Sequence, residues 1–261
     1  NAGSAPKSIW LPDWDRLPRT HRRSHLGARQ DSQRIFAIKG NLGFSPIHMT
    51  YFGVLIRYII PAILLLWLAL YFALRRGRSI PAILTALPAG FVLLVHILVA
   101  LVYTTPWDNY LVATRVWWYE PDLVTGVTLD WVPIEEYLFF ILQSTLSGSW
   151  LILLAVLFKE KVEQSSIESP VDARKLRLWS TLLAFLVWLA AVSILIIGWQ
   201  PGNYMALILA WALPPIMLQL GFGADIIWQY RRLVVTAITS TTLYLSFVDS
   251  LAITAGTWII N

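Results

Sequence analysis

Long apolar stretches alternate with short polar ones over most of this chain. Six of the apolar stretches are each about as long as the ~20 residues that a helix needs to cross a bilayer. They cover residues 51–74, 82–103, 132–158, 179–199, 204–222 and 233–259. Backbone groups in lipid must bond within their own segment, so we expect these stretches to be helices. Runs this long and uncharged exclude a transmembrane β-barrel, whose strands are shorter and alternate in polarity.

Composition leads to the same prediction. The 261 residues are 57% hydrophobic and only 13% charged, whereas charged residues make up about 25% of a soluble domain. We therefore predict an all-α integral membrane protein with six transmembrane helices and a polar N-terminal tail. The chain has no cysteine, which excludes disulfides and cysteine nucleophiles. Its net charge of +5 falls on the tail and loops, where it indicates topology and lipid contact, so no nucleic-acid partner is expected.

The tail, residues 1–50, is rich in arginine. Prolines at positions 6, 12 and 18 argue against one long helix there. Two interpretations stay open, a solvated basic arm and a segment that docks to anionic lipid or to a partner subunit. The histidines of this region show no metal-ligand spacing, so no metal site is predicted. They are His21, His25 and His48.

Basic clusters follow the first span, follow the third and precede the sixth, in loops 75–78, 159–177 and 231–232. The positive-inside rule places these loops in the cytoplasm. The acidic loop 104–131 then lies on the non-cytoplasmic side of a multi-pass protein in the cell (cytoplasmic) membrane. The basic tail would lie outside, against the rule, but charges close to span ends dominate orientation.

Carboxylates stand at the ends of two apolar stretches and within a third. Asp108 belongs to segment 105–112, Glu135 and Glu136 to segment 133–140, and Asp249 lies inside the last stretch. Ionisable groups at membrane depth are costly and usually functional. Plainer interpretations exist for the first three, because Asp108 could be an interfacial loop residue and acids after a proline suit a helix dipole.

An internal repeat links two of these acids. Asp108 precedes Trp117 by the same spacing that separates Asp249 from Trp258. Spans one and two therefore pair with spans five and six, as a parallel repeat about an axis along the membrane normal. We expect a first repeat at 51–158, a linker and connecting helix at 159–202, and an incomplete second repeat at 203–261. The repeat predicts a seventh helix that the chain does not contain.

These motifs carry a resemblance to a known family. The runs TPWDNYLV (105–112), WY (118–119) and VPIEEYLFF (132–140), with TLYLSFVD (242–249) and GTW (256–258), resemble the membrane-integral lycopene cyclase domain. The resemblance covers about residues 51–260. It implies the family pattern of seven helices, of which the last is absent here, and redox-neutral cyclisation of a linear carotenoid such as lycopene. No cofactor is required, and the carotenoid is either substrate or bound pigment.

Such a cyclisation needs a proton added to an alkene, a carbocation kept from water, and another proton removed. We expect Glu135 or Glu136 to donate, with its neighbour bonded to Asn109 or the backbone. Asp108 and Asp249 would tune the donor or act as general base. Aromatic faces would bind the polyene and stabilise the cation. The candidates are Trp107, Trp118, Tyr119, Tyr137, Phe139, Phe140, Tyr244 and Trp258.

Two other functions fit parts of the pattern. One is a non-catalytic carotenoid-binding or structural subunit of a larger membrane complex, for example a photosynthetic one. The other is a transporter, which parallel repeats would suit. Membrane lipid is a partner in every case, and a homo- or hetero-oligomer is compatible with each. The lone His96 within span two is more often a helix-packing residue than a ligand.

Overall fold

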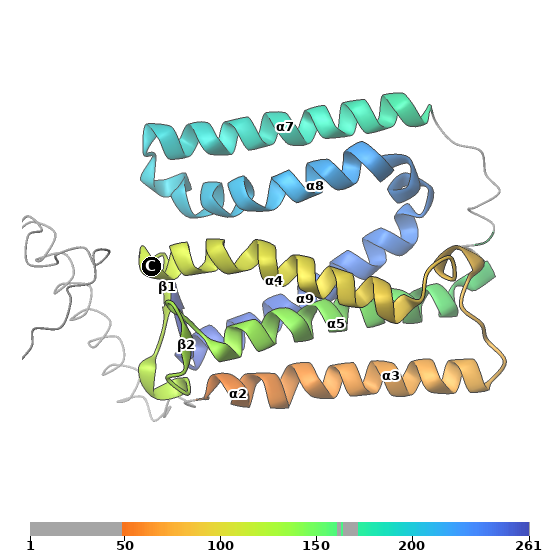
Figure 1. The fold of residues 1–261 in the computed structure, drawn as a ribbon, viewed down its shortest axis with the longest axis horizontal. Coiled ribbons are helices and arrows are strands. Elements are labelled where there is room, and N and C mark those ends of the chain that lie inside the picture. The colour runs from red at the N-terminus through yellow and green to blue at the C-terminus, as the bar shows by residue number, and fades with distance from the viewer. Residues whose placement is uncertain (1–48, 161–162, 164–171, 261) are drawn as a thin grey trace, which may run out of the picture. The chain divides into compact units, whose positions relative to one another are not determined.

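The computed structural model describes residues 49–160, 163 and 172–260, all within one compact unit, His48–Asn261. The predicted tail, with His21, His25 and His48, lies outside the described residues, apart from Met49 and Thr50. Six helices of the described part are long and apolar enough to cross a membrane (Figure 1). The prediction of a helical membrane protein with six spans is therefore confirmed.

The first span is one continuous helix with a change of register. It begins as α2 (Tyr51–Val54), passes through the π-helical turn η2 (Leu55–Ile59) and continues as α3 (Ile60–Arg75). Pro61 has no N–H with which to continue the α-helical ladder, and the π turn precedes it. Within this turn the Tyr58 carbonyl accepts a hydrogen bond from the Tyr244 hydroxyl at 2.7 Å, which ties the first span to the last.

The second span is displaced from its predicted bounds. Residues after Pro81 form only the 3-10 turn η3 (Ala82–Leu84), and α4 (Ala89–Ala113) starts after Pro88. A residue that precedes a proline disfavours the α conformation, which explains the late start. The helix then continues through Pro106 to Ala113. The expected loop from residue 104 was therefore wrong at its start, and Asp108 lies inside a helix.

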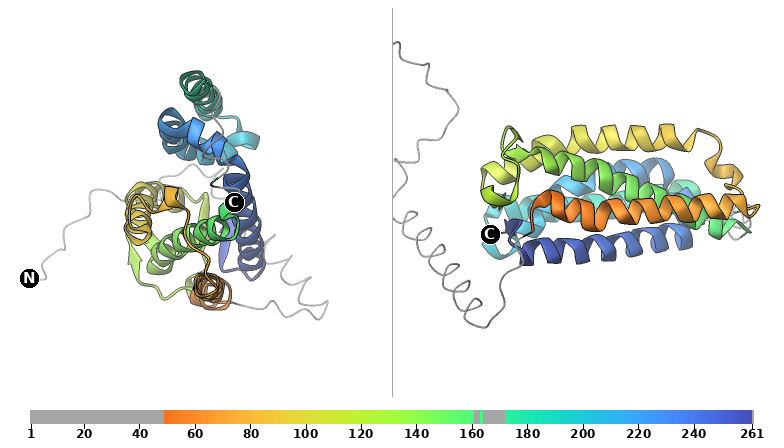
Figure 2. Two further views of the ribbon diagram at one scale, coloured as in Figure 1. Left: turned by 90° about the vertical axis from the view of Figure 1, so that its right-hand side faces the viewer. Right: turned by 90° about the horizontal axis from the view of Figure 1, so that it is seen from below.

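Helix α5 (Ile134–Leu157) packs against α3, α4 and α9 (Arg231–Thr254), as the end-on view of Figure 2 helps to show. Two indole N–H groups join it to its neighbours. Trp67 on α3 donates to Ser149 at 3.0 Å, and Trp150 donates to Ser240 on α9 at 2.6 Å. Because α5 contacts three spans, it places its first turn, with the two glutamates, among them.

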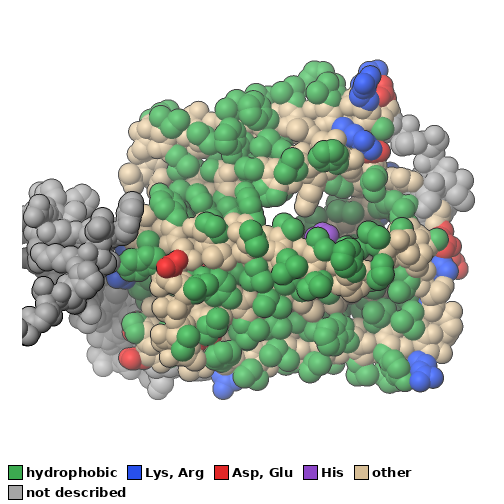
Figure 3. Space-filling model, in the orientation of Figure 1, with side chains coloured by type: hydrophobic (Ala, Val, Ile, Leu, Met, Phe, Trp, Pro, Cys, Tyr) green, Lys and Arg blue, Asp and Glu red, His purple; other side chains and the backbone are tan. Residues whose placement is uncertain are grey.

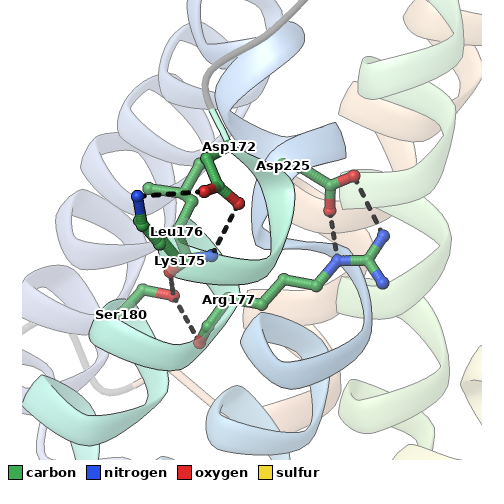
Figure 4. A network of polar contacts seen from close by, with 6 residues as sticks. All are labelled: Asp172, Lys175, Leu176, Arg177, Ser180 and Asp225. Carbon is green, nitrogen blue, oxygen red and sulfur yellow. Dashed lines mark hydrogen bonds and ion pairs between the residues drawn. The ribbon is translucent and has the colours of Figure 1, made fainter.

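Helices α7 (Ala173–Ile197) and α8 (Asn203–Gln229) lie side by side (Figure 1). The Arg177 guanidinium of α7 donates two hydrogen bonds to the Asp225 carboxylate of α8, at 2.6 and 2.9 Å (Figure 4). Prolines inside a helix usually bend it, but the residue with non-helical backbone angles in α8 is Gly223 (φ −145°, ψ 18°), not Pro214 or Pro215.

Short strands close the end of the bundle opposite the basic loops. Strand β1 (Trp117–Tyr119) pairs antiparallel with β4 (Trp258–Ile260), and β2 (Thr128–Leu129) pairs with β3 (Val132–Pro133). These strands were not predicted, and the last helix was expected to extend to residue 259. That helix ends at Thr254, because Gly256 adopts a positive φ of 77°. The chain then turns into β4 and reaches the first half of the molecule.

The ends of α4 and α9 have the same hydrogen-bond pattern, as the repeat predicts. After α4 the Val116 N–H donates to the Leu111 carbonyl at 2.9 Å, and after α9 Thr257 donates to Ala252 at 2.9 Å. The residues just before these donors both have positive φ, and they are Arg115 and Gly256. The two Asp-to-Trp segments are thus structurally equivalent, while the proposed domain boundaries stay a prediction.

Charged and apolar side chains occupy different parts of the molecular surface along the helix axes. Lys and Arg gather mainly at one end of the face in Figure 3, and hydrophobic side chains cover the helices between. At the basic end Arg78 donates to the Leu157 carbonyl at 2.8 Å, and Lys159 contacts Ser79 at 2.5 Å. The loops after the first and third spans are therefore neighbours, as the predicted topology requires.

Candidate active site

Glu136 is held by two phenols from different parts of the chain. It lies in the first turn of α5, half-buried, and its Oε2 accepts hydrogen bonds from Tyr51 and from Tyr119, the second at 2.9 Å. Tyr51 is the first residue of α2, and Tyr119 the last of β1. Three elements therefore converge on one carboxyl group.

The two tyrosines stack on each other and on the second repeat. The Tyr51 and Tyr119 rings lie 6.0 Å apart with an interplanar angle of 21°, and the Trp258 ring of β4 lies 5.0 Å from Tyr51. Burial and the nearby Glu136 and Asp108 carboxyls raise the pKa of Tyr119 well above its ordinary value. Tyr119 therefore keeps its proton and serves as a hydrogen-bond donor.

Asp108 faces this group from α4. Its side chain is only 2% exposed, and no hydrogen bond from the described residues reaches Oδ2. The Trp117 indole lies against its carboxyl and against the Tyr119 hydroxyl. Asp108 and Glu136 are close enough to interact electrostatically. A buried polar atom without a partner is rare, and its presence here leaves a site at which another molecule could bond.

Asp249 of α9 completes the acidic group. It interacts electrostatically with Glu136 and with Tyr204, the second residue of α8. Three of the predicted acids, from α4, α5 and α9, are thus brought together. No salt bridge to Lys or Arg involves any of them in the described part of the chain. An unpaired carboxylate is costly away from water, so the arrangement suits carboxylic acids that exchange protons.

Glu135 points elsewhere, although it precedes Glu136 in the chain. Its side chain is 1% exposed, and its Oε1 accepts a hydrogen bond from the Thr125 backbone N–H at 2.6 Å. Neighbouring residues of a helix point about 100° apart, which separates the two carboxyls. Of the two alternatives for the neighbouring glutamate, Asn109 or the backbone, Glu135 uses the backbone.

Asn109 connects α4 to the loop rather than to a glutamate. Its amide donates to the Thr105 carbonyl at 3.0 Å and to the Tyr137 hydroxyl at 3.1 Å. Its Oδ1 accepts from the Trp131 N–H at 2.9 Å. Tyr137 in turn donates to the Leu129 carbonyl at 3.2 Å. These bonds fold the segment between α4 and α5 over the acids.

The predicted aromatic residues divide between the site and its surroundings. Tyr119, Trp258 and Phe139 surround Tyr51, the last with ring centroids 6.5 Å apart. Trp118 faces the other side of β1, because alternate strand residues point to opposite faces. The others pack or bond within the protein. They are Phe140 in a buried cluster, Tyr137 beside it, and Tyr244 bonded to Tyr58.

Trp107 lies at a separate apolar pocket of about 850 Å³ between α4 and α8. The Tyr103 ring stacks on Trp211 there, with centroids 5.7 Å apart, and its hydroxyl bonds to the Trp211 carbonyl at 2.6 Å. By helical geometry, Asp108 lies on the face of α4 opposite to Val99, which lines the pocket. The pocket and the acidic group therefore occupy different faces of this helix.

Three residues that bond to the acids or interact with them electrostatically were not predicted to do so, namely Tyr51, Trp117 and Tyr204. One signal could have found two of them. Tyr51 stands ten residues before Pro61, and Tyr204 ten residues before Pro214. Extending the repeat to the start of spans one and five would have marked both tyrosines. Trp117 ends the first Asp-to-Trp segment of the repeat, but it was not among the aromatic residues predicted for the site.

Comparison with known proteins gives relatives of one kind. The chain is 39% identical over 161 residues to a lycopene beta-cyclase of Halobacterium salinarum, a match that covers 62% of this chain and 63% of that protein. It is 34% identical over 168 residues to a bifunctional lycopene cyclase/phytoene synthase of Podospora anserina, covering 63% of this chain and 28% of that protein. A protein of the same name from Arthroderma gypseum is 33% identical over 182 residues, with 62% and 29% covered.

The matches span less than two thirds of the length of these relatives. No protein-family model matches the chain, and no solved structure matches it either. The names of these relatives nevertheless all describe a lycopene cyclase, and the motifs that surround the acidic group in this structure are those that resemble the same domain. Over 62% of its length the chain is therefore similar to a lycopene beta-cyclase, and over a similar share to bifunctional lycopene cyclase/phytoene synthases.

Proposed function

We propose that this protein cyclises the end group of lycopene to a β ring within the membrane. The observation that carries the proposal is the meeting of Asp108, Glu136 and Asp249 from three helices, without a cationic partner among the described residues. The names of the relatives supply the substrate and the ring type. They favour catalysis over the alternative of a structural carotenoid-binding subunit.

The reaction begins with proton transfer from Glu136. Its O–H bond breaks as a C–H bond forms at the terminal alkene, which leaves a carboxylate and a tertiary carbocation. A second alkene of the same chain attacks the cation and closes the ring. Asp108 or Asp249 then removes a proton from a carbon next to the new cationic centre, which forms the ring double bond. One proton is added and one removed, so we propose that no redox cofactor takes part.

Acid–base catalysis of this kind contributes about 10²–10⁴-fold to a rate. Aromatic faces stabilise a passing cation through their quadrupoles. Tyr51 and Tyr119, which bond to Glu136, are placed to do so, and the Trp258 ring lies 5.0 Å from that of Tyr51. The substrate is apolar, so it reaches the site from the lipid.

We also propose the orientation of the protein in the cytoplasmic membrane. Basic residues cluster at the end of α3, after α5 and at the starts of α7 and α9, and we place these segments at the cytoplasmic surface. The acidic group and the strands then lie near the opposite surface. Neither an oligomer nor a larger complex is needed for this arrangement, and both stay predictions.

The test is expression in cells that accumulate lycopene, followed by analysis of their pigments. We expect the wild-type chain to form β rings, and Glu136→Gln to form at least about 100-fold fewer. Asp122→Asn is the matched control, because Asp122 is an exposed acid in the loop at the same end of the bundle and should leave ring formation unchanged. Absence of rings with the wild type, or full activity of Glu136→Gln, would contradict the proposal.

A further inference from the structure

Both hydrogen bonds to Glu136 end on the same oxygen atom. Tyr51 and Tyr119 donate to Oε2, and no hydrogen bond from the described residues reaches Oε1. We propose that the two tyrosines are positioning residues that hold Glu136 by Oε2 and so leave Oε1 to carry the transferable proton. This inference rests on the proposed function, because it assigns the proton of the same reaction to one atom.

The chemistry of a carboxyl group supports this assignment. A carboxylic acid has one hydroxyl oxygen and one carbonyl oxygen, and the carbonyl oxygen has two lone pairs for hydrogen bonds. Two phenol donors therefore occupy Oε2 fully and make it the carbonyl oxygen. The proton must then sit on Oε1, to which neither tyrosine donates. After transfer the same two donors stabilise the carboxylate that remains, because hydrogen bonds to an anion are stronger than those to a neutral oxygen.

The phenols are held firmly enough to orient a side chain. Tyr51 is 1% exposed, and its ring lies against Tyr119 and Trp258. The fully buried Thr257 hydroxyl bonds to the Met49 carbonyl at 2.6 Å, which joins the chain just before Tyr51 to the residue just before Trp258. The second repeat thus fixes the tyrosine that orients the glutamate of the first.

Tyrosines that only stabilised the fold would make the same contacts. The test must therefore separate a structural role of Tyr51 and Tyr119 from a role in positioning Glu136. Tyr51→Phe and Tyr119→Phe keep the stacked rings and remove one hydroxyl each. We expect each variant to form rings about 10-fold more slowly, which is the usual effect of losing one hydrogen bond to a charged group. Tyr71→Phe is the matched control, because Tyr71 is an exposed tyrosine near the other end of α3 whose hydroxyl only accepts a bond from Arg75.

Infrared spectroscopy of the purified protein gives a readout that packing alone would not change. The carbonyl stretch of protonated Glu136 is the band that Glu136→Gln removes. We expect this band to move to higher wavenumber in Tyr51→Phe and again in Tyr119→Phe, because each loses a donor to the carbonyl oxygen. Tyr71→Phe should leave it in place. An unshifted band in both variants, or no such band in the wild type, would overturn the inference.

The two readouts also separate this inference from the proposed function. If the wild type forms no ring, the proposed function fails, and with it the assignment of a transferable proton, whatever the band shows. If the wild type forms rings and both phenylalanine variants keep full activity with unshifted bands, only the positioning role fails. Reduced activity with a shifted band supports both.

Discussion

At the scale of single residues, two adjacent glutamates differ because a helix turns by about 100° between them. Glu135 bonds to the backbone of the loop, whereas Glu136 bonds to two tyrosines. The sequence predicted that one of these two glutamates is the proton donor. It could not indicate which one, because that depends on which face of α5 meets the strands. Tyr51, which donates to Glu136, lies 85 residues away from it in the chain, and no local sequence pattern indicates a contact over that separation.

Glu135→Gln should therefore reduce stability and keep activity. Its amide oxygen still accepts the Thr125 N–H, but more weakly than a carboxylate, so we expect the free energy of unfolding to fall by about 1 kcal/mol. Thermal unfolding in detergent measures the first effect, and ring formation per amount of folded protein measures the second. A variant as stable as the wild type that forms no rings would instead identify Glu135 as the acid.

At the scale of elements, hydropathy identified all six spans, and local hydrogen bonding set their ends. Pro81 and Pro88 delay the start of α4, and Gly256 ends α9, although the apolar pattern continues across all three positions. An apolar count cannot see these ends, because lipid-facing helices and interfacial strands share the same residue types. Asp108 was consequently recognised as an acid of the site but was placed in a loop.

The ion pair between α7 and α8 is a further test at this scale. Asp225→Asn removes the carboxylate that accepts both bonds from Arg177, and we expect a lower unfolding midpoint, with a smaller effect when Arg177 is already replaced by Gln. Lys175→Gln is the control, because the exposed Lys175–Asp172 pair at 3.2 Å should contribute almost nothing. If the losses of stability in Asp225→Asn and in Arg177→Gln simply added in the double variant, Arg177 and Asp225 would not be coupled.

At the scale of the whole molecule, the two halves of the repeat contact each other through the pairing of β1 with β4. Trp118 pairs with Ile259 at the centre of the strand pair, and the residues on either side pair symmetrically. The strands that begin at the Trp of each Asp-to-Trp segment are therefore related by a local two-fold axis, with the equivalent residues Trp118 and Ile259 opposite each other. The sequence showed the repeat through spacing, but it could not show that the segments pair, because pairing depends on the packing of α4, α5 and α9.

Orientation in the membrane is the last prediction, and the absence of cysteine makes it accessible. A single cysteine introduced at Arg76, or separately at Asp122, would be the only thiol of the protein, and both positions are exposed. In intact cells a membrane-impermeant maleimide should label Asp122→Cys, whereas Arg76→Cys should react only after the membrane is opened. The reason is the basic clusters beside the spans, since cytoplasmic loops carry the excess of Lys and Arg. The reverse labelling pattern would place the acidic group near the cytoplasmic surface.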